Sequence, residues 1–239
     1  AAIALAFAGS ASAVSLSGFN EADANTVTIR IAGSSAHDKG LQKLLQLKST
    51  SGVEICQANT LDVYTAGSSD FIYACTAGAN SSVNGKKLVI IKKSSGGSGT
   101  GVGTLVKAGT VNLDDATTVN SNYLDPTNAT LQGLPGTTQT STNSNLSDYV
   151  LHTTGSSSGL TVASATGADV GISDVEPPIF RKLFNPDLKA SELSALTVKG
   201  ISSVIFGVPV TLNVYQRLQA LQFASGNVCN PNNASYGLI

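Results

Sequence analysis

The sequence predicts an α/β protein with a mainly parallel sheet and flanking helices, and three observations lead to this class. Short β-branched and apolar runs of strand length alternate with segments of helical spacing. Gly/Ser-rich turns follow several of these runs directly. The 239 residues are 41% hydrophobic, which is enough for a sizeable core. Alternating strands and helices favour parallel pairing, with ligands bound at loops beyond the carboxyl ends of the strands.

The elements follow in chain order. TVTIRIA, residues 26–32, alternates as a strand does, and the leucine spacing of residues 41–47 predicts a helix after the turn Gly33-Ser34-Ser35. Residues 114–158 are dense in Thr, Asn, Ser and Gly, so we expect a long polar loop or surface excursion there, without core residues. Further strands are expected over residues 61–65, 71–75, 87–92, 168–172, 201–206 and 208–212, and a closing helix over 214–223.

Residues 1–13, AAIALAFAGSASA, are an apolar run that ends in small residues, as signal peptidase requires. We therefore expect a signal peptide remnant followed by one domain over residues 14–239, secreted to the periplasm or the extracellular space. The run is shorter than the roughly 20 residues of a membrane span, so no membrane anchor is expected. The absence of methionine indicates that the precursor starts upstream. The alternative is that residues 1–13 form a buried helix of the mature fold.

Charge and cysteine content narrow the class of partner. Charged residues make up 12% of the chain and the net charge is -1, which gives no electrostatic basis for binding nucleic acid or an anionic membrane. In an oxidising compartment we expect Cys56 and Cys75 to form a disulfide worth about 3 kcal/mol. Cys229 is left over, which indicates truncation at the C-terminus or a partner in another chain. His37 and His152 lack the spacing of metal ligands, so no metal or cofactor is expected.

Three Gly/Ser-rich loops are candidates for ligand binding. KKSSGGSGTGVG, residues 92–103, directly follows a predicted strand, and its glycines let backbone N–H groups converge on an oxyanion. It is not a Walker loop, and the alternative is a plain flexible turn. Ser34 and Ser35 either cap a helix or contact a ligand. DVGISD, residues 169–174, delivers Asp174 to the end of a strand, where it accepts a proton from a partly protonated oxyanion or caps a turn.

Together, TVTIRIAGSSA, KKSSGGSGTGVG and DVGISDVEP resemble the phosphate-binding-protein-like group of type 2 periplasmic binding proteins. The resemblance implies that fold and an oxyanion held by strand-end Ser, Gly and Asp residues. Two features depart from the family: the Ser-Gly-Thr loop precedes the Ser-Asp loop, and Ser94 stands where the receptors carry an arginine. The ligand candidates that the resemblance implies are Ser98, Gly99, Thr100, Ser173 and Asp174, with Ser34 and Ser35 as first-loop hydroxyls and Lys93 in place of the arginine.

The leading functional hypothesis is noncatalytic binding of a small oxyanion such as phosphate, or of a similar polar ligand, with a transporter or surface protein as a further partner. One alternative is a secreted phosphatase-like hydrolase in which Ser98 is the nucleophile, although neither histidine lies beside it in the sequence. Another is an extracellular structural or adhesive protein, because the chain is low in charge, rich in Ser, Thr and Asn, and carries the unpaired Cys229.

Overall fold

The computed structural model describes residues 14–107, 111–112, 122–163, 167–200, 212–222, 227 and 229–234. They belong to two compact units, residues 1–197 and 198–239. The predicted signal peptide remnant and the strands predicted between residues 201 and 211 lie outside the described residues. In the second unit, the predicted closing helix is confirmed as α5 (Leu212–Gln222).

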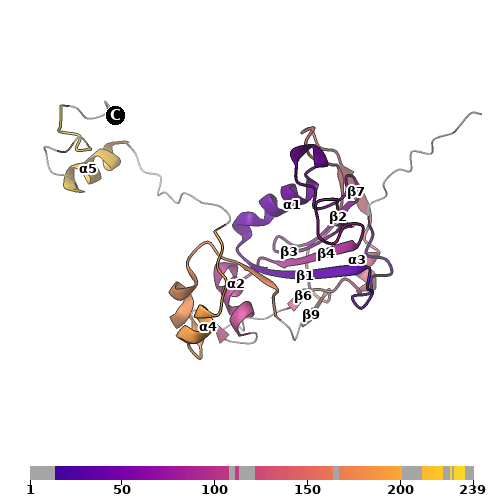
Figure 1. Cartoon of the computed structure of the whole chain (residues 1–239). Coiled ribbons are helices and arrows are strands. Elements are labelled where there is room, and N and C mark those ends of the chain that lie inside the picture. The colour runs from indigo at the N-terminus through magenta and orange to yellow at the C-terminus, as the bar shows by residue number, and fades with distance from the viewer. Residues whose placement is uncertain are drawn as a thin grey trace, which may run out of the picture. The chain divides into compact units, whose positions relative to one another are not determined.

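A seven-stranded mixed sheet forms the centre of the first unit, in the order β10-β1-β4-β3-β2-β8-β7 (Figure 1). Three neighbouring pairs are parallel and three antiparallel, so the α/β class is confirmed while a mainly parallel arrangement is not shown. The antiparallel pairs arise because β3 and β7 run against their neighbours. The strands are β1 (Thr26–Gly33), β2 (Leu61–Ala66), β3 (Asp70–Thr76), β4 (Lys87–Lys93), β7 (Gly136–Gln139), β8 (Tyr149–Thr154) and β10 (Val170–Ile172).

Five of these strands, β1, β2, β4, β8 and β10, run in the same direction, because β2 and β4 are both antiparallel to β3. Their last residues therefore lie along one edge of the sheet. We call it the carboxyl edge, and it is formed by Gly33, Ala66, Lys93, Thr154 and Ile172. In open sheets of this kind, the loops beyond that edge are the usual place for a ligand site.

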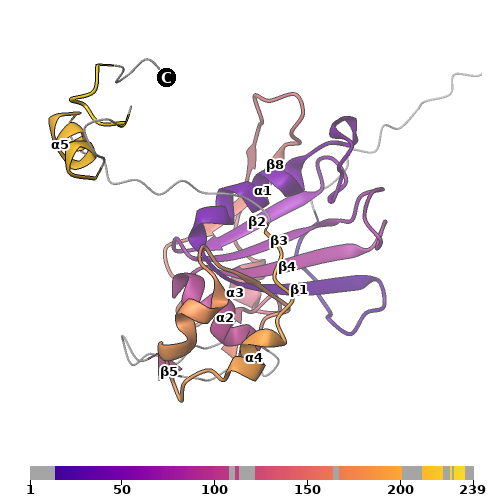
Figure 2. The same ribbon diagram turned by 60° about the vertical axis from the view of Figure 1, so that its left-hand side comes forward.

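Helices cover both faces of the sheet. Figures 1 and 2 show α1 (Asp38–Gln46) on one face and α2 (Gly97–Val106) on the other. Alternation along β4 divides its apolar side chains between the two sides. Leu88 and Ile90 belong to a cluster that includes Leu45 of α1, whereas Val89 and Ile91 belong to a second cluster. Fully buried tyrosines belong to both clusters, Tyr73 to the first and Tyr64 and Tyr123 to the second.

Glycine allows α2 to approach the sheet closely. The Cα of Gly101 lies beside Gly33, and a Cβ added at Gly101 would overlap the carbonyl oxygen of Ile172. Gly33 also has φ +115, a conformation that side-chain-bearing residues rarely adopt. Part of the glycine content of residues 92–103 therefore serves packing of α2 against β1 and β10.

The prediction of a long loop without core residues over 114–158 is wrong for the described part, residues 122–158. This part holds β6 (Asn122–Leu124) and α3 (Ala129–Gln132) as well as β7 and β8. Tyr123, Leu124 and Leu131 are buried. β6 and α3 supply only one or two large apolar side chains each and β7 supplies none, too few for a periodic pattern. The remaining elements are η1 (Ser35–His37), η2 (Ser49–Ser51), β5 (Val111–Asn112), β9 (Thr161–Ala163), η3 (Pro177–Lys182), β11 (Phe184–Asn185) and α4 (Ala190–Ser194).

The predicted disulfide between Cys56 and Cys75 is present, with a Cα–Cα distance of 5.7 Å. It joins β3 to the segment before β2, and its 19-residue separation corresponds to about 3 kcal/mol of loop-closure entropy. The bond is consistent with a secreted protein. In the described part of the chain, no helix has the length and apolar character needed to cross a bilayer.

Candidate functional site

Three loops meet at the carboxyl edge because β1 lies between β4 and β10. In the register, Ala32 is opposite Lys93 and Gly33 is opposite Ile172, so the three strands end side by side. The loops that follow them are the three that the sequence singled out. We call the group formed by Ser34, Ser98 and Asp174, one residue from each loop, the strand-end site.

Hydrogen bonds join the three side chains. The Ser34 Oγ donates to Asp174 Oδ2 at 2.5 Å, and the Ser98 Oγ donates to the same oxygen at 3.1 Å. The backbone N–H of Asp174 donates in return to Ser98 Oγ at 3.0 Å. Residues 76 and 140 positions apart in sequence are thus held in one cluster. Ser34 Oγ also accepts from the N–H of Ala36 as the N-cap of η1, so capping and membership of the site coexist at this residue.

The second carboxylate oxygen of Asp174 is the chemically distinctive atom of the site. Asp174 Oδ1 is buried and has no hydrogen-bond partner among the described residues. The Nδ1 atom of the His37 imidazole lies 3.8 Å from this oxygen. A buried carboxylate oxygen without a donor is costly, and this one is an acceptor that a ligand hydroxyl could satisfy.

Backbone donors accompany the strand-end site at the start of α2. The helix begins after Gly96, whose φ is 81, and the first helical residue, Gly97, also has a positive φ of 57. The N–H groups of Ser98 and Gly99 lie in the first turn, where the helix itself supplies no carbonyl acceptor. The positive end of the helix dipole also lies here. Donors and dipole together favour negative charge on a ligand at this point.

Other predicted ligand residues have different roles. The hydroxyl of Ser173 donates to the carbonyl of Val175 at 2.6 Å and so belongs to its own turn. Thr100 is buried within α2, and Ser35 is exposed in η1. The ammonium of Lys93 donates to the carbonyl of Asn122 at 3.1 Å rather than to any atom of the strand-end site.

Lys92, which sequence reasoning missed, connects the loop after β1 to the loop after β4. Its side chain is fully buried, and its Nζ donates at 3.2 Å to the carbonyl oxygens of Gly33 and Ser34. The same ammonium lies 2.6 Å from Ser94 Oγ and forms an ion pair with Asp38 at 2.8 Å. Ser94 Oγ in turn donates to Asp38 Oδ1 at 2.7 Å. Strand alternation was the available signal, because it directs adjacent lysines at the end of a strand to opposite faces.

No family model, curated protein or solved structure matches the chain. The class of protein is therefore defined by the fold and the site alone. It is an α/β protein with a mixed seven-stranded sheet and a cluster of two serines and an aspartate at the carboxyl edge.

Proposed function

We propose that the strand-end site binds a small oxyanion that carries at least one proton, such as monohydrogen phosphate, without catalysing a reaction on it. The observation that carries the proposal is the convergence of Ser34, Ser98 and Asp174 from three separate loops. The likeness of these loops to the phosphate-binding-protein-like group of type 2 periplasmic binding proteins supports the same ligand class. We extend the proposal to that fold family and to an exported protein that delivers its ligand to a transporter or surface partner.

The chemistry of Asp174 determines which oxyanion fits. The N–H groups at the start of α2 attract an anion, as do the hydroxyls of Ser34 and Ser98 when they turn from Asp174 Oδ2 to the ligand. The carboxylate of Asp174 repels an anion. Two unit charges about 4 Å apart repel by about 4 kcal/mol at an effective dielectric constant of about 20. A ligand oxygen that bears a proton removes this repulsion by donating to Asp174 Oδ1, the buried acceptor without a partner. The expected preference for monohydrogen phosphate over sulfate is therefore large, up to about 1,000-fold.

The hydrolase alternative has weaker support. In a Ser–His–Asp relay, the imidazole lies between the serine and the carboxylate. Here the carboxylate of Asp174 lies between the other two groups, with Oδ2 on Ser98 and Oδ1 facing His37. Transfer of a proton from Ser98 to an imidazole needs the two groups in direct contact, whereas Asp174 separates Ser98 from His37.

Titration calorimetry of the full chain with inorganic phosphate and with sulfate at pH 7 tests the proposal. We expect heat from phosphate and binding of sulfate at least 100-fold weaker. Asp174→Asn should bring the two affinities together, because the neutral amide no longer repels sulfate. Asp148→Asn is the matched control, since Asp148 accepts a backbone hydrogen bond in the turn between β7 and β8.

The absence of heat from phosphate, sulfate and small carboxylates alike would refute oxyanion binding. Turnover of p-nitrophenyl phosphate that Ser98→Ala abolishes would replace the binding proposal with the hydrolase.

A further inference from the structure

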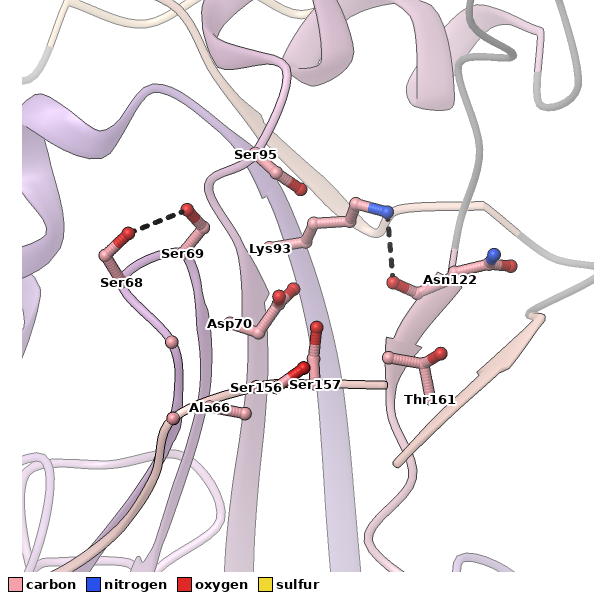
Figure 3. Close-up of a pocket in the computed structure, with 12 residues that line it drawn as sticks. Ala66, Ser68, Ser69, Asp70, Lys93, Ser95, Asn122, Ser156, Ser157 and Thr161 are labelled. Carbon is pink, nitrogen blue, oxygen red and sulfur yellow. Dashed lines mark hydrogen bonds between the residues drawn. The ribbon is translucent and has the colours of Figure 1, made fainter. Parts of the chain in front are cut away.

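A pocket that contains none of the residues of the strand-end site lies at the carboxyl edge (Figure 3). Its volume is about 470 Å³, within the range of pockets that hold small molecules. The β2–β3 turn, the end of β4, the start of β6 and the β8–β9 loop contribute its walls. Of the residues that the structure describes, no aromatic side chain lines it, and six hydroxyls do: Ser68, Ser69, Ser95, Ser156, Ser157 and Thr161.

Strand alternation separates this pocket from the strand-end site. Lys92 points to one face of the sheet, where it binds the β1 loop, and the next residue, Lys93, points to the other face and lines the pocket. Ile91, two residues before Lys93, belongs to the core cluster of that second face. The lysine that the sequence assigned to an oxyanion is therefore part of a different site.

The described lining of the pocket includes one positive and one negative side chain, which form no direct ion pair with each other. Asp70 and Lys93 are opposite each other in the β3–β4 register and line the same pocket. They form no ion pair in the described part of the chain, and Figure 3 shows Lys93 extended toward Asn122. Burial raises the pKa of Asp70, opposed by a hydrogen bond with Ser157 and by the charge of Lys93. Burial lowers the pKa of Lys93, opposed by the charge of Asp70. Both charges are thus partly removed from solvent, and each has a neutral hydrogen-bond partner, Ser157 for Asp70 and the Asn122 carbonyl for Lys93, rather than an ion pair.

We propose that this pocket binds a free α-amino acid in its zwitterionic form, with the ligand ammonium on Asp70 and the ligand carboxylate on Lys93. Among the described lining residues the two charged side chains sum to zero, so a net anion would face Asp70 and a net cation would face Lys93. A neutral polyol would leave both charges without a counterion. The surrounding hydroxyls complement a polar side chain such as an amide. This ligand is distinct from the oxyanion proposed for the strand-end site.

The test is titration calorimetry of the full chain with L-glutamine, N-acetyl-L-glutamine and L-glutamine amide. The acetyl derivative lacks the ammonium and the amide derivative lacks the carboxylate. We expect L-glutamine to bind and each derivative to bind at least 10-fold more weakly. Because this comparison uses the unaltered protein, it does not depend on whether any variant folds.

Two variants then assign each charge to its partner. Asp70→Asn should weaken L-glutamine at least 10-fold without weakening the acetyl derivative, because that anionic ligand has no ammonium to lose and is no longer repelled by the carboxylate. Lys93→Gln should weaken L-glutamine at least 10-fold without weakening the amide derivative, because that cationic ligand has no carboxylate to lose and is no longer repelled by the ammonium. Asp148→Asn and Lys182→Gln are the matched controls, and both should bind L-glutamine as the parent chain does.

The proposal is overturned if L-glutamine, L-serine and L-asparagine give no heat, or if blocking either charged group of glutamine leaves its affinity unchanged. Sorbitol binding as tightly as glutamine would identify a polyol site instead. Asp174→Asn separates the two proposals, since it should alter phosphate binding and leave glutamine binding within twofold. Phosphate binding that responds to Lys93→Gln and not to Asp174→Asn would place the oxyanion in this pocket and overturn both proposals.

Discussion

Replacing Lys92 by methionine removes the ammonium that joins the loops of the strand-end site. The side chain of Lys92 is fully buried, and its ion-pair partner Asp38 has 12% of its side chain exposed. Methionine retains an unbranched apolar stem of similar length, so the variant removes charge and hydrogen-bond donors without opening a large cavity. The carboxylate of Asp38 and the carbonyl oxygens of Gly33 and Ser34 then lose a common donor.

The expected cost follows from burial. Removing one partner of a buried ion pair destabilises a protein by about 3 to 5 kcal/mol, because the remaining charge is left in a poorly solvated environment. That is a large part of the roughly 5 to 15 kcal/mol of a typical domain. Removing both charges is often nearly neutral, so the double variant Lys92→Met/Asp38→Leu should recover part of the loss.

Urea denaturation followed by far-ultraviolet circular dichroism measures the change in the free energy of unfolding. Lys182→Met is the matched control, because the Lys182–Asp187 pair has almost the same separation, 2.9 Å, but 80% of the Lys182 side chain is exposed. An exposed pair of this kind is worth less than about 1 kcal/mol. If Lys92→Met costs no more than Lys182→Met, the reasoning from burial is wrong.

Two further predictions concern packing and pH. Gly101→Ala should destabilise the protein by about 1 to 3 kcal/mol, because the added Cβ overlaps the backbone of β10. A Cβ added at Gly40 in α1 meets nothing within 4 Å, so Gly40→Ala should instead stabilise the protein by about 0.5 to 1 kcal/mol. Thermal unfolding compares the two variants. Equal effects would contradict the close approach of α2 to the sheet. Burial raises the pKa of the Asp62 carboxyl, although His152 and Lys87 oppose the shift. As pH rises, the unfolded chain therefore loses this proton at a lower pH than the folded protein does. Stability should therefore fall as pH rises from about 4, the unfolded value, through the raised folded value. Asp62→Asn should flatten that part of the profile in urea titrations between pH 3.5 and 7.5, whereas an unchanged slope would show that Asp62 is not its source.

Local sequence patterns predicted the elements whose apolar residues recur with a clear period. The strand expected over residues 26–32 is β1, and the run expected over 87–92 is β4, each within one residue of its observed bounds. The polar composition of residues 122–158 predicts a loop because β6, α3 and β7 carry few large side chains. Their burial comes from neighbours that are distant in sequence, and a local window does not contain those neighbours.

Local sequence patterns also do not determine whether two neighbouring strands pair in parallel or antiparallel. A buried apolar run such as β4 has the same composition whether its neighbour is parallel or antiparallel. In the structure β4 has one neighbour of each kind, β1 and β3. Only the assembled sheet decides between them, because the hydrogen bonds of a strand are made with its partners.

The chain by itself determined the α/β class, the Cys56–Cys75 disulfide, and the three polar loops at strand ends, because each depends on nearby residues or on composition. Tertiary structure decided which of those loop residues meet. Ser34, Ser98 and Asp174 come together because β1 lies between β4 and β10, while alternation turns Lys92 beneath that site and Lys93 into a separate pocket. Side-chain contact depends on strand order and on the face of the sheet, and both are properties of the folded sheet as a whole.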